Sequence, residues 1–137
     1  MLTPFHLAIH VHDLDDARVF YRDVLGCPEG RSAATWVDFN FFGHQLSLHL
    51  GPPFANAKTG MVGDAPVSMP HFGVVLLLPD WQGLRARLQA AGIQFDLEPS
   101  VRFLGQIGEQ WTMFIRDPSG NPIEIKGFPH LDGVFVH

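Results

Sequence analysis

Residues 6–26 read HLAIHVHDLDDARVFYRDVLG and residues 71–92 read HFGVVLLLPDWQGLRARLQAAG, and the order of features in these two stretches decides the fold. Each stretch opens with a histidine on an extended apolar run, continues with apolar residues at helical spacing, and closes on a glycine. A pattern that restarts in this way indicates an internal duplication.

The first copy predicts a strand, a helix and two further strands. Along 5–11 the residues alternate, which places His6 and His10 on the face opposite to the apolar side chains. Asp13 is expected to cap a helix that ends at Gly26. Strands are then expected over 36–42 and 45–50, with a turn near Gly43.

The second copy predicts the same order. We expect a strand over 71–78, a helix capped by Asp80 and ended by Gly92, and a short strand over 93–97. Two more strands, 110–116 and 122–127, are joined by the turn 117–121. The stretch 51–70 is rich in proline and glycine and poor in large apolar residues, which predicts an irregular linker.

These elements predict a single α+β domain over residues 1–137, built from two βαβββ modules that form a cupped, half-open, mostly antiparallel barrel. Module one covers residues 1–50, the linker 51–70, module two 71–127 and a C-terminal tail 128–137. The tail carries Leu131, Val134, Phe135 and Val136, which is too apolar for a free end. We therefore expect the tail to pack on something, for which a second subunit is one candidate.

The composition excludes several classes of protein. Hydrophobic residues make up 46% and charged residues 17% of the chain, which is enough for a core and too little charge for a disordered chain. The net charge is −5 and no run of Lys or Arg occurs, so nucleic acid is not an expected partner. The single Cys27 excludes an internal disulfide and a Cys-rich zinc site. No signal peptide or membrane-spanning run is recognisable, so a cytoplasmic protein without membrane association is expected.

Three residues could carry metal chemistry. The repeat places His6 and His71 at the starts of equivalent strands, which would meet if the two halves pair about a pseudo-two-fold axis. Glu124 lies on the last strand, where its neighbours Ile123 and Ile125 face the opposite side. Alone, each histidine would be an ordinary strand residue; together they give a ligand set of two imidazoles and one carboxylate. Such a set suits Fe(II), Mn(II), Zn(II) or Ni(II) and leaves coordination positions open.

The same residues carry a resemblance to a known family. The segments 6–9 and 13–26, with Phe20-Tyr21 before Val24-Leu25-Gly26, resemble the first module of the vicinal oxygen chelate superfamily, which includes glyoxalases, bleomycin resistance proteins and extradiol dioxygenases. Segment 70–74 resembles the start of its second module, and DPSGNPIE at 117–124 resembles its ending. The resemblance covers nearly the whole chain. It implies that His6, His71 and Glu124 bind one divalent metal, with Fe(II) or Mn(II) favoured, and that the protein forms a homodimer.

The resemblance leaves the reaction open. Members of the glyoxalase type take a fourth ligand from the last strand of module one, where the best-aligned residue here is Ser47 and where Gln45 or His49 could substitute. Extradiol members have an acid/base histidine just before this strand, and His44 is similar to it. They also tend to carry a tyrosine where this chain has Phe114. Short proteins described as predicted dioxygenases share the FGHQ of 42–45.

The sequence therefore predicts a metal-dependent enzyme acting on a small substrate with vicinal oxygens. An extradiol-type dioxygenase with His44 as the catalytic acid/base is the first expectation. A glyoxalase-like isomerase or lyase is the alternative within the enzymes. A metal-free small-molecule binding protein, like the antibiotic-sequestering members of the family, is the alternative outside them.

Overall fold

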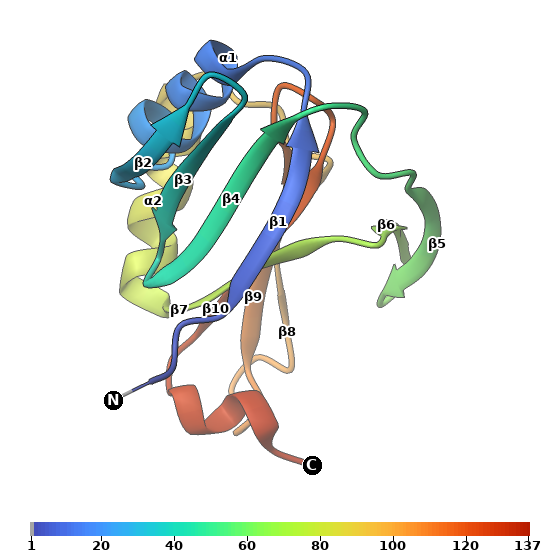
Figure 1. The fold of residues 1–137 in the computed structure, drawn as a ribbon. Coiled ribbons are helices and arrows are strands. Elements are labelled where there is room, and N and C mark those ends of the chain that lie inside the picture. Colours follow the sequence, from blue (N-terminus) through green and yellow to red (C-terminus); the bar gives the residue numbers. More distant parts are fainter. Residues whose placement is uncertain (1) are drawn as a thin grey trace. The chain divides into compact units, whose positions relative to one another are not determined.

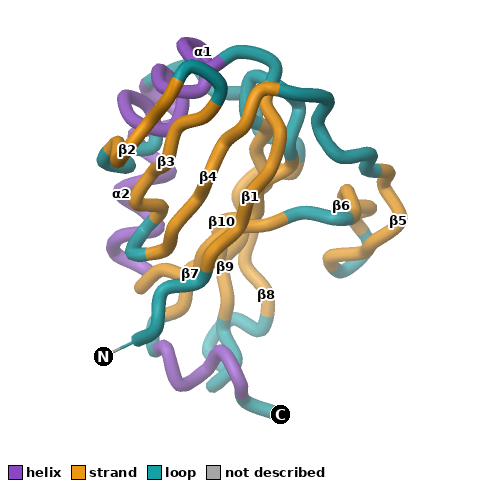
Figure 2. The backbone as a smooth tube through the Cα atoms, viewed as in Figure 1, coloured by secondary structure: helices purple, strands orange, loops and turns teal. Residues whose placement is uncertain are grey.

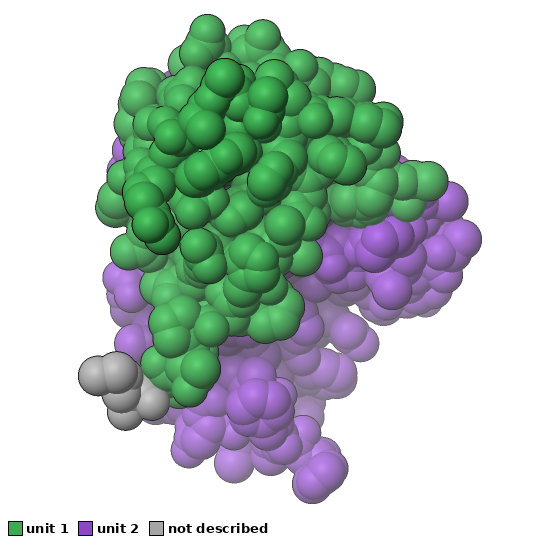
Figure 3. Space-filling model, viewed as in Figure 1, with its two compact units in different colours: residues 1–55, 117–121 green, residues 56–116, 122–137 purple. Residues whose placement is uncertain are grey.

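The computed structural model describes residues 2–137. It divides into two compact units (Figure 3): unit 1 holds residues 1–55 and 117–121, and unit 2 holds residues 56–116 and 122–137. The short segment 117–121 thus belongs to unit 1, although the strands on either side of it belong to unit 2.

Unit 1 is a four-stranded sheet covered on one face by a helix (Figure 1). Its elements in chain order are β1 His6–Val11, α1 Leu14–Arg18, the π-helical turn η1 Val19–Val24, β2 Glu29–Ala33, β3 Trp36–Phe41 and β4 His44–Leu50. The strand order is β1-β4-β3-β2, in which β1 and β4 run parallel and the other pairs run antiparallel. The predicted βαβββ module is therefore confirmed.

The alternation of residues explains which face of this sheet is buried. Val37, Phe39, Leu46 and Leu48 are buried, and Tyr21 packs on Phe39 with ring centroids 5.6 Å apart. The opposite face carries polar residues at matched register: His6 beside Gln45, and Ser47 beside Asp38. The expected helix cap is also confirmed, because the side chain of Asp13 accepts a hydrogen bond of 2.8 Å from the Asp16 backbone N–H.

The turn 117–121 is organised around the buried carboxylate of Asp117. The Tyr21 hydroxyl donates to it at 2.8 Å, the backbone N–H groups of Ser119 and Asn121 donate at 2.9 Å each, and the Asn121 side-chain amide donates at 2.9 Å. Burial, followed by the charge and hydrogen bond of Asp117, holds the pKa of Tyr21 well above its usual value. Asp117 thus holds the DPSGN turn together through four hydrogen bonds to its carboxylate.

Unit 2 repeats the module and has an additional hairpin before it in the sequence (Figures 1 and 2). The hairpin is β5 Ala57–Val62 and β6 Ala65–Met69. The module follows as β7 Phe72–Leu77, α2 Leu78–Ala90, β8 Leu97–Arg102, β9 Gln110–Arg116 and β10 Pro122–Phe128, and the 3₁₀ helix η2 Leu131–Phe135 comes last. The sheet order β7-β10-β9-β8 and its parallel β7–β10 pair match those of unit 1. The α+β class and the two βαβββ modules are thus confirmed, with antiparallel pairs in the majority.

The interior of unit 2 lies between α2 and the sheet. Trp81 on α2 is fully buried, and its indole N–H donates at 2.9 Å to the Ile125 carbonyl on β10. A Cβ at Gly127 would lie 2.6 Å from the Trp81 ring, so this position accepts no larger residue without a shift of the helix. Met113, Ile115, Ile123 and Ile125 complete the core.

The stretch 51–70 differs from the expectation of an irregular linker. Most of it forms the two-stranded sheet β5–β6, which turns at Gly63 with a φ of +57°. Proline is compatible with this sheet because both strands of a two-stranded sheet are edge strands, where proline is tolerated. Glycine and proline content therefore did not exclude a hairpin here.

Two other expectations are wrong in detail, and one strand was not located from the sequence. Asp80 is not the cap of α2, because the helix already begins at Leu78 with Pro79 in its first turn. The strand expected over 93–97 lies at Leu97–Arg102. The exposed strand β2 has no apolar alternation, so its pattern gave no sign of it.

The tail ends in η2, which lies beside the loop between β8 and β9. A Cβ at Gly133 would meet the Ile107 carbonyl at 2.7 Å, which shows how closely the two segments approach. Phe135 is nevertheless 86% exposed and Ile107 76% exposed. Across residues 2–137, no helix has the length and apolar character needed to cross a membrane.

Candidate metal centre

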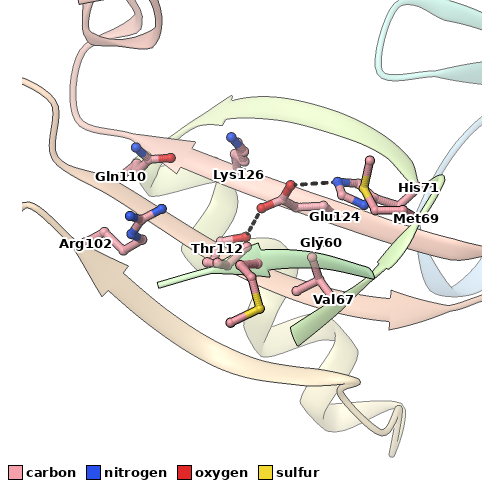
Figure 4. A pocket seen from close by; sticks show the side chains of 11 residues that line it. Gly60, Val67, Met69, His71, Arg102, Gln110, Thr112, Glu124 and Lys126 are labelled. Carbon is pink, nitrogen blue, oxygen red and sulfur yellow. Dashed lines mark hydrogen bonds and ion pairs between the residues drawn. The ribbon is translucent and has the colours of Figure 1, made fainter. Parts of the chain in front are cut away.

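His71 and Glu124 face one another in unit 2 (Figure 4). Glu124 lies in the middle of β10 and is buried, while His71 directly precedes β7. The His71 Nε2 atom lies 3.2 Å from the Glu124 Oε1 atom. Two of the three residues predicted to bind metal are therefore in direct contact.

The hydrogen bond on the other side of the imidazole decides what this contact means. The His71 Nδ1 atom lies 2.7 Å from the Ser68 carbonyl oxygen, at the end of β6. A carbonyl only accepts, so Nδ1 carries the proton and donates it. In the neutral ring Nε2 is then an unprotonated electron-pair donor aimed at a carboxylate oxygen. Two such atoms attract each other only through a shared cation, which is either a proton or a metal ion.

The second oxygen of Glu124 is held in place by Thr112 on β9. The Thr112 hydroxyl is buried and donates to Glu124 Oε2 at 2.6 Å. This bond fixes the carboxylate so that Oε1 faces His71. A histidine bonded to a carbonyl and a carboxylate bonded to a hydroxyl are the supporting contacts that protein metal ligands usually have.

The distance between the two facing atoms also fits a metal. Ligand atoms at about 2.1 Å from one ion are separated by about 3.0 Å at octahedral angles and about 3.4 Å at tetrahedral angles. The observed 3.2 Å between Nε2 and Oε1 lies between these values. The pair therefore fits two adjacent positions on one divalent cation.

Glycine at position 73 makes this geometry possible. Gly73 pairs with Glu124 across the parallel β7–β10 ladder. A Cβ at Gly73 would collide with the backbone carbonyl of Glu124, and backbone can yield only if the strands separate. The close approach of β7 to β10 next to the candidate ligands thus requires glycine.

The matching position in unit 1 carries no ligand. Ala8 pairs with Ser47 in the β1–β4 ladder as Gly73 pairs with Glu124, and His6 precedes Ala8 by two residues as His71 precedes Gly73. His6 is therefore the counterpart of His71, which agrees with the repeat in the sequence. It lies exposed on β1 of unit 1. Within the described residues 2–137, neither unit taken alone brings three His, Cys, Asp or Glu side chains together as a metal cluster.

The candidates for a fourth ligand are engaged within unit 1. The Gln45 amide donates to Asp38 at 3.2 Å, and Ser47 donates to the other oxygen of Asp38 at 2.6 Å. His49 stacks on Trp36 with ring centroids 6.3 Å apart. The Gln45 amide oxygen remains free of these contacts, whereas the His49 ring already has an aromatic partner.

His44, the predicted acid/base, lies at the start of β4 and is tied to the backbone. Its Nδ1 atom accepts a hydrogen bond of 2.8 Å from the Phe5 N–H. In the neutral ring the proton must then be on Nε2. Phe114 lies opposite Glu124 on β9 and packs edge-on against the His71 ring, with centroids 5.0 Å apart.

A pocket of about 350 Å³ in unit 2 opens over the His71–Glu124 pair (Figure 4). Apolar side chains of the hairpin line one side, among them Val67 and Met69. Arg102, Gln110 and Lys126 line the end away from His71. No sequence pattern singled out Thr112, Arg102 or Gln110. Lys126 was not singled out either, although strand alternation places it on the same face as Glu124.

Comparison with known proteins identifies the family of the chain. The model of the Glyoxalase/Bleomycin resistance protein/Dioxygenase superfamily matches residues 3–125. The chain belongs to this superfamily. No relative with a curated description matches the sequence.

Solved structures of the superfamily share its fold. A glyoxalase/bleomycin resistance protein/dioxygenase from Alicyclobacillus acidocaldarius is 34% identical, with 97% of this chain and 96% of that chain covered and a TM-score of 0.75. A lactoylglutathione lyase from Agrobacterium tumefaciens is 21% identical, with 100% and 98% covered and a TM-score of 0.68. The fosfomycin resistance protein FosX from Listeria monocytogenes is 16% identical, with 97% and 96% covered and a TM-score of 0.64. The last two likenesses concern the fold alone.

Proposed function

We propose that the protein is a metal-dependent enzyme acting on a small substrate that binds one divalent metal through vicinal oxygens. The observation that carries this proposal is the approach of His71 Nε2 to Glu124 Oε1 at 3.2 Å, while the other ring nitrogen of His71 is bonded to the Ser68 carbonyl. In this proposal His71 and Glu124 supply two ligands. His6 is assigned as the third ligand because it is the counterpart of His71 in the first copy of the repeat. Fe(II) or Mn(II) is the favoured metal, with Zn(II) and Ni(II) as alternatives.

Ring cleavage of a catechol by dioxygen is the first reaction to test. A bound divalent metal would stabilise negative charge on the two substrate oxygens. The residues of the chain would then orient the substrate, and Thr112 would keep Glu124 in its ligating position. His44 is the proposed acid/base, and its Nε2–H is the proton that it would exchange, because Nδ1 is occupied by the Phe5 N–H.

A glyoxalase-like isomerase or lyase is the second candidate, and one contact favours it. The hydrogen bond from the Gln45 amide nitrogen to Asp38 fixes the amide plane and leaves the amide oxygen available. Oxygen is the ligating atom of a glutamine, so this is the orientation that a fourth ligand needs. Under this candidate Gln45→Ala lowers metal affinity, whereas under ring cleavage it leaves affinity unchanged.

The first experiment measures metal content and metal affinity. Protein purified without chelators is analysed for metals, and metal-free protein is titrated with Mn(II), Fe(II), Zn(II) and Ni(II). We expect one equivalent of metal to bind. The Kd should rise about 100-fold or more in Glu124→Gln and in His71→Ala, because loss of even a supporting contact of a metal ligand lowers metal affinity about 10–100-fold. His6→Ala tests the third ligand in the same way.

A matched carboxylate serves as the control. Glu29→Gln on β2 of unit 1 makes the same change at a glutamate that pairs with Arg18, outside the candidate ligands, and is expected to leave metal affinity unchanged. Retention of full metal affinity by Glu124→Gln would contradict the proposal. Absence of metal binding in the unmodified protein would do so too, and would favour a metal-free small-molecule binding protein. Oxygen uptake with catechol, lost in Glu124→Gln, then separates ring cleavage from isomerase or lyase chemistry.

A homodimer is also part of the proposal. Leu104, Ile107 and Phe135 are 66%, 76% and 86% exposed on unit 2, and clustered exposed apolar side chains usually belong to an interface. Sedimentation equilibrium should show a dimer that Phe135→Ser weakens. A monomer at micromolar concentration would refute this part alone.

A further inference from the structure

One end of the pocket in unit 2 is cationic. Arg102 on β8 and Lys126 on β10 flank Gln110 on β9, and all three side chains line the pocket wall (Figure 4). In the register of the sheet, Arg102 is opposite Gln110 and Lys126 is opposite Thr112. Two positive charges and an amide thus project from three neighbouring strands into one end of the pocket.

Neither cation is neutralised by the protein. No carboxylate of residues 2–137 forms an ion pair with Arg102 or Lys126, although Glu124 lies only two residues from Lys126 on the same face of β10. Glu124 is directed instead toward Thr112 and His71. Arg102 has one aromatic contact, its guanidinium carbon lying 4.9 Å from the Phe103 ring centroid, and that contact leaves its charge uncompensated.

Unpaired cations that are half-buried in a pocket favour an anionic ligand. Both side chains are only partly exposed, so a bound anion there would be attracted more strongly than one in open water. Arginine and lysine beside an amide donor can together give three or more hydrogen bonds to a carboxylate or phosphonate. The opposite wall of the pocket, formed by Val67, Met69 and Met61 of the hairpin, is apolar.

The spacing along β10 gives the distance between the two polar ends. Lys126 follows Glu124 by two residues, and two strand residues span about 6.6 Å. We propose that the substrate is an acid: a small molecule with vicinal oxygens at one end and a carboxylate or phosphonate about 7 Å away, held by Arg102, Lys126 and Gln110. This inference rests on the proposed function for the vicinal oxygens, and on the cationic end of the pocket for the acid group.

A pair of catechols tests the acid group. The ligand 3,4-dihydroxyphenylacetate has its carboxylate across the ring from the vicinal oxygens, and 3,4-dihydroxyphenylacetamide has the same shape without the charge. Binding of each to Mn(II)-loaded protein is measured by calorimetry without oxygen, so that neither ligand is consumed. We expect the acid to bind about tenfold or more tightly than the amide, because hydrogen bonds to charged groups are the stronger ones.

Substitution of the two cations should remove this preference. In Arg102→Gln and in Lys126→Gln the ratio of the two Kd values should fall several-fold, and in the double variant it should approach one. Lys58→Gln is the matched control, since Lys58 is an exposed cation on β5 outside the pocket lining. Equal binding of acid and amide to the unmodified protein, or an unchanged ratio in the double variant, would overturn the inference.

The metal is measured separately, so that the two proposals fail separately. A Mn(II) titration without any catechol should give the same Kd for the unmodified protein, Arg102→Gln and Lys126→Gln. If Mn(II) does not bind at all, the metal proposal fails, and phenylacetate against phenylacetamide on the metal-free protein still tests the cationic end. A preference for phenylacetate that Lys126→Gln abolishes would then support the acid-binding inference alone, and its absence would overturn it.

Discussion

Each unit buries one carboxylate of special interest, and the two are bonded in opposite ways. Asp117 in unit 1 is 4% exposed and accepts hydrogen bonds from Tyr21, from two backbone N–H groups and from the Asn121 amide. Glu124 in unit 2 is 8% exposed and accepts from the Thr112 hydroxyl, while its other oxygen lies 3.2 Å from His71 Nε2. A saturated carboxylate stabilises a turn, whereas one that faces a histidine nitrogen can share a proton or a metal ion with it.

The two ladders differ in the same sense at their matched positions. Module two places Glu124 opposite Gly73, and module one places Ser47 opposite Ala8. The carboxylate of module one, Asp38, lies one strand further away and is bonded by Ser47 and Gln45. The duplication therefore preserved the strand order and the histidine while only one copy has a carboxylate in contact with its histidine.

The largest effect is expected from substituting Gly73, which lies opposite Glu124, and comparing it with a substitution of its counterpart Ala8, which lies opposite Ser47. Gly73→Ala should destabilise the protein by about 3–5 kcal/mol and abolish metal binding, because the new Cβ forces β7 away from Glu124. The reverse change in module one, Ala8→Gly, should cost only about 1 kcal/mol. Urea unfolding and a metal titration check both variants. Similar stability losses in the two would mean that the modules do not differ here.

Removing the donor to Glu124 should have the next largest effect. Thr112→Val keeps the shape of the side chain but leaves Oε2 without its hydrogen bond, so metal affinity should fall about 10–100-fold. Thr112→Ser restores a hydroxyl and should recover most of the affinity. Thr59→Val, which makes the same change at an exposed hydroxyl on β5, is the control and is expected to leave the Kd for Mn(II) unchanged. An unaltered Kd in Thr112→Val would refute the positioning role.

The saturated carboxylate of unit 1 gives a smaller effect on stability. Tyr21→Phe removes one of the four donors to Asp117 and should cost about 1–2 kcal/mol without changing metal affinity. Because the folded-state pKa of Tyr21 is raised, its contribution is fully present below the unfolded pKa of about 10 and is lost as the pH rises above it. The stability difference between the two proteins, measured by urea unfolding, should therefore shrink above pH 10. A difference that stays constant to pH 11.5 would contradict this account.

The smallest effect concerns a partly exposed carboxylate, Glu109. It accepts hydrogen bonds from the Gly105 N–H and the Trp111 indole, which lower its pKa. Its contribution to folding is present above its unfolded pKa of about 4.3 and is lost as the pH falls through its lower folded value. The NMR shift of the Trp111 indole proton should follow this titration and should not titrate in Glu109→Gln. The Trp81 indole, bonded to a carbonyl, serves as the internal control.

The repeated strands and helices could be predicted from the sequence because they depend on local patterns. Alternation placed His6 and Glu124 on the faces opposite to the apolar residues, and the matching ladders confirm that His6 and His71 are counterparts. Lys126 could have been added by the same alternation, since it shares the face of Glu124. Arg102 could not, because its strand was expected over 93–97 and lies at Leu97–Arg102, and the irregular pattern around β8 gave no register.

No pattern in the sequence predicts the hydrogen bonds that orient His71 and Glu124. The bond to the Ser68 carbonyl involves the backbone, which every residue possesses. It also depends on the β5–β6 hairpin, where the glycine and proline content predicted an irregular linker. The hydroxyl of Thr112 is one of several on the strands and becomes informative only once it is found 2.6 Å from Glu124. The prediction of a metal ligand set could therefore name residues but not protonation.

The position of Ser68 has a consequence for how this protein could be modified by evolution or by design. The segment between the modules supplies both the carbonyl that orients His71 and the apolar wall of the pocket. A change in its length or turn would move the two together, so that the shape of the pocket and the orientation of the His71 ring are not independent of each other. Any substitution that enlarges the pocket while keeping this ring orientation has to leave the Ser68 carbonyl in place.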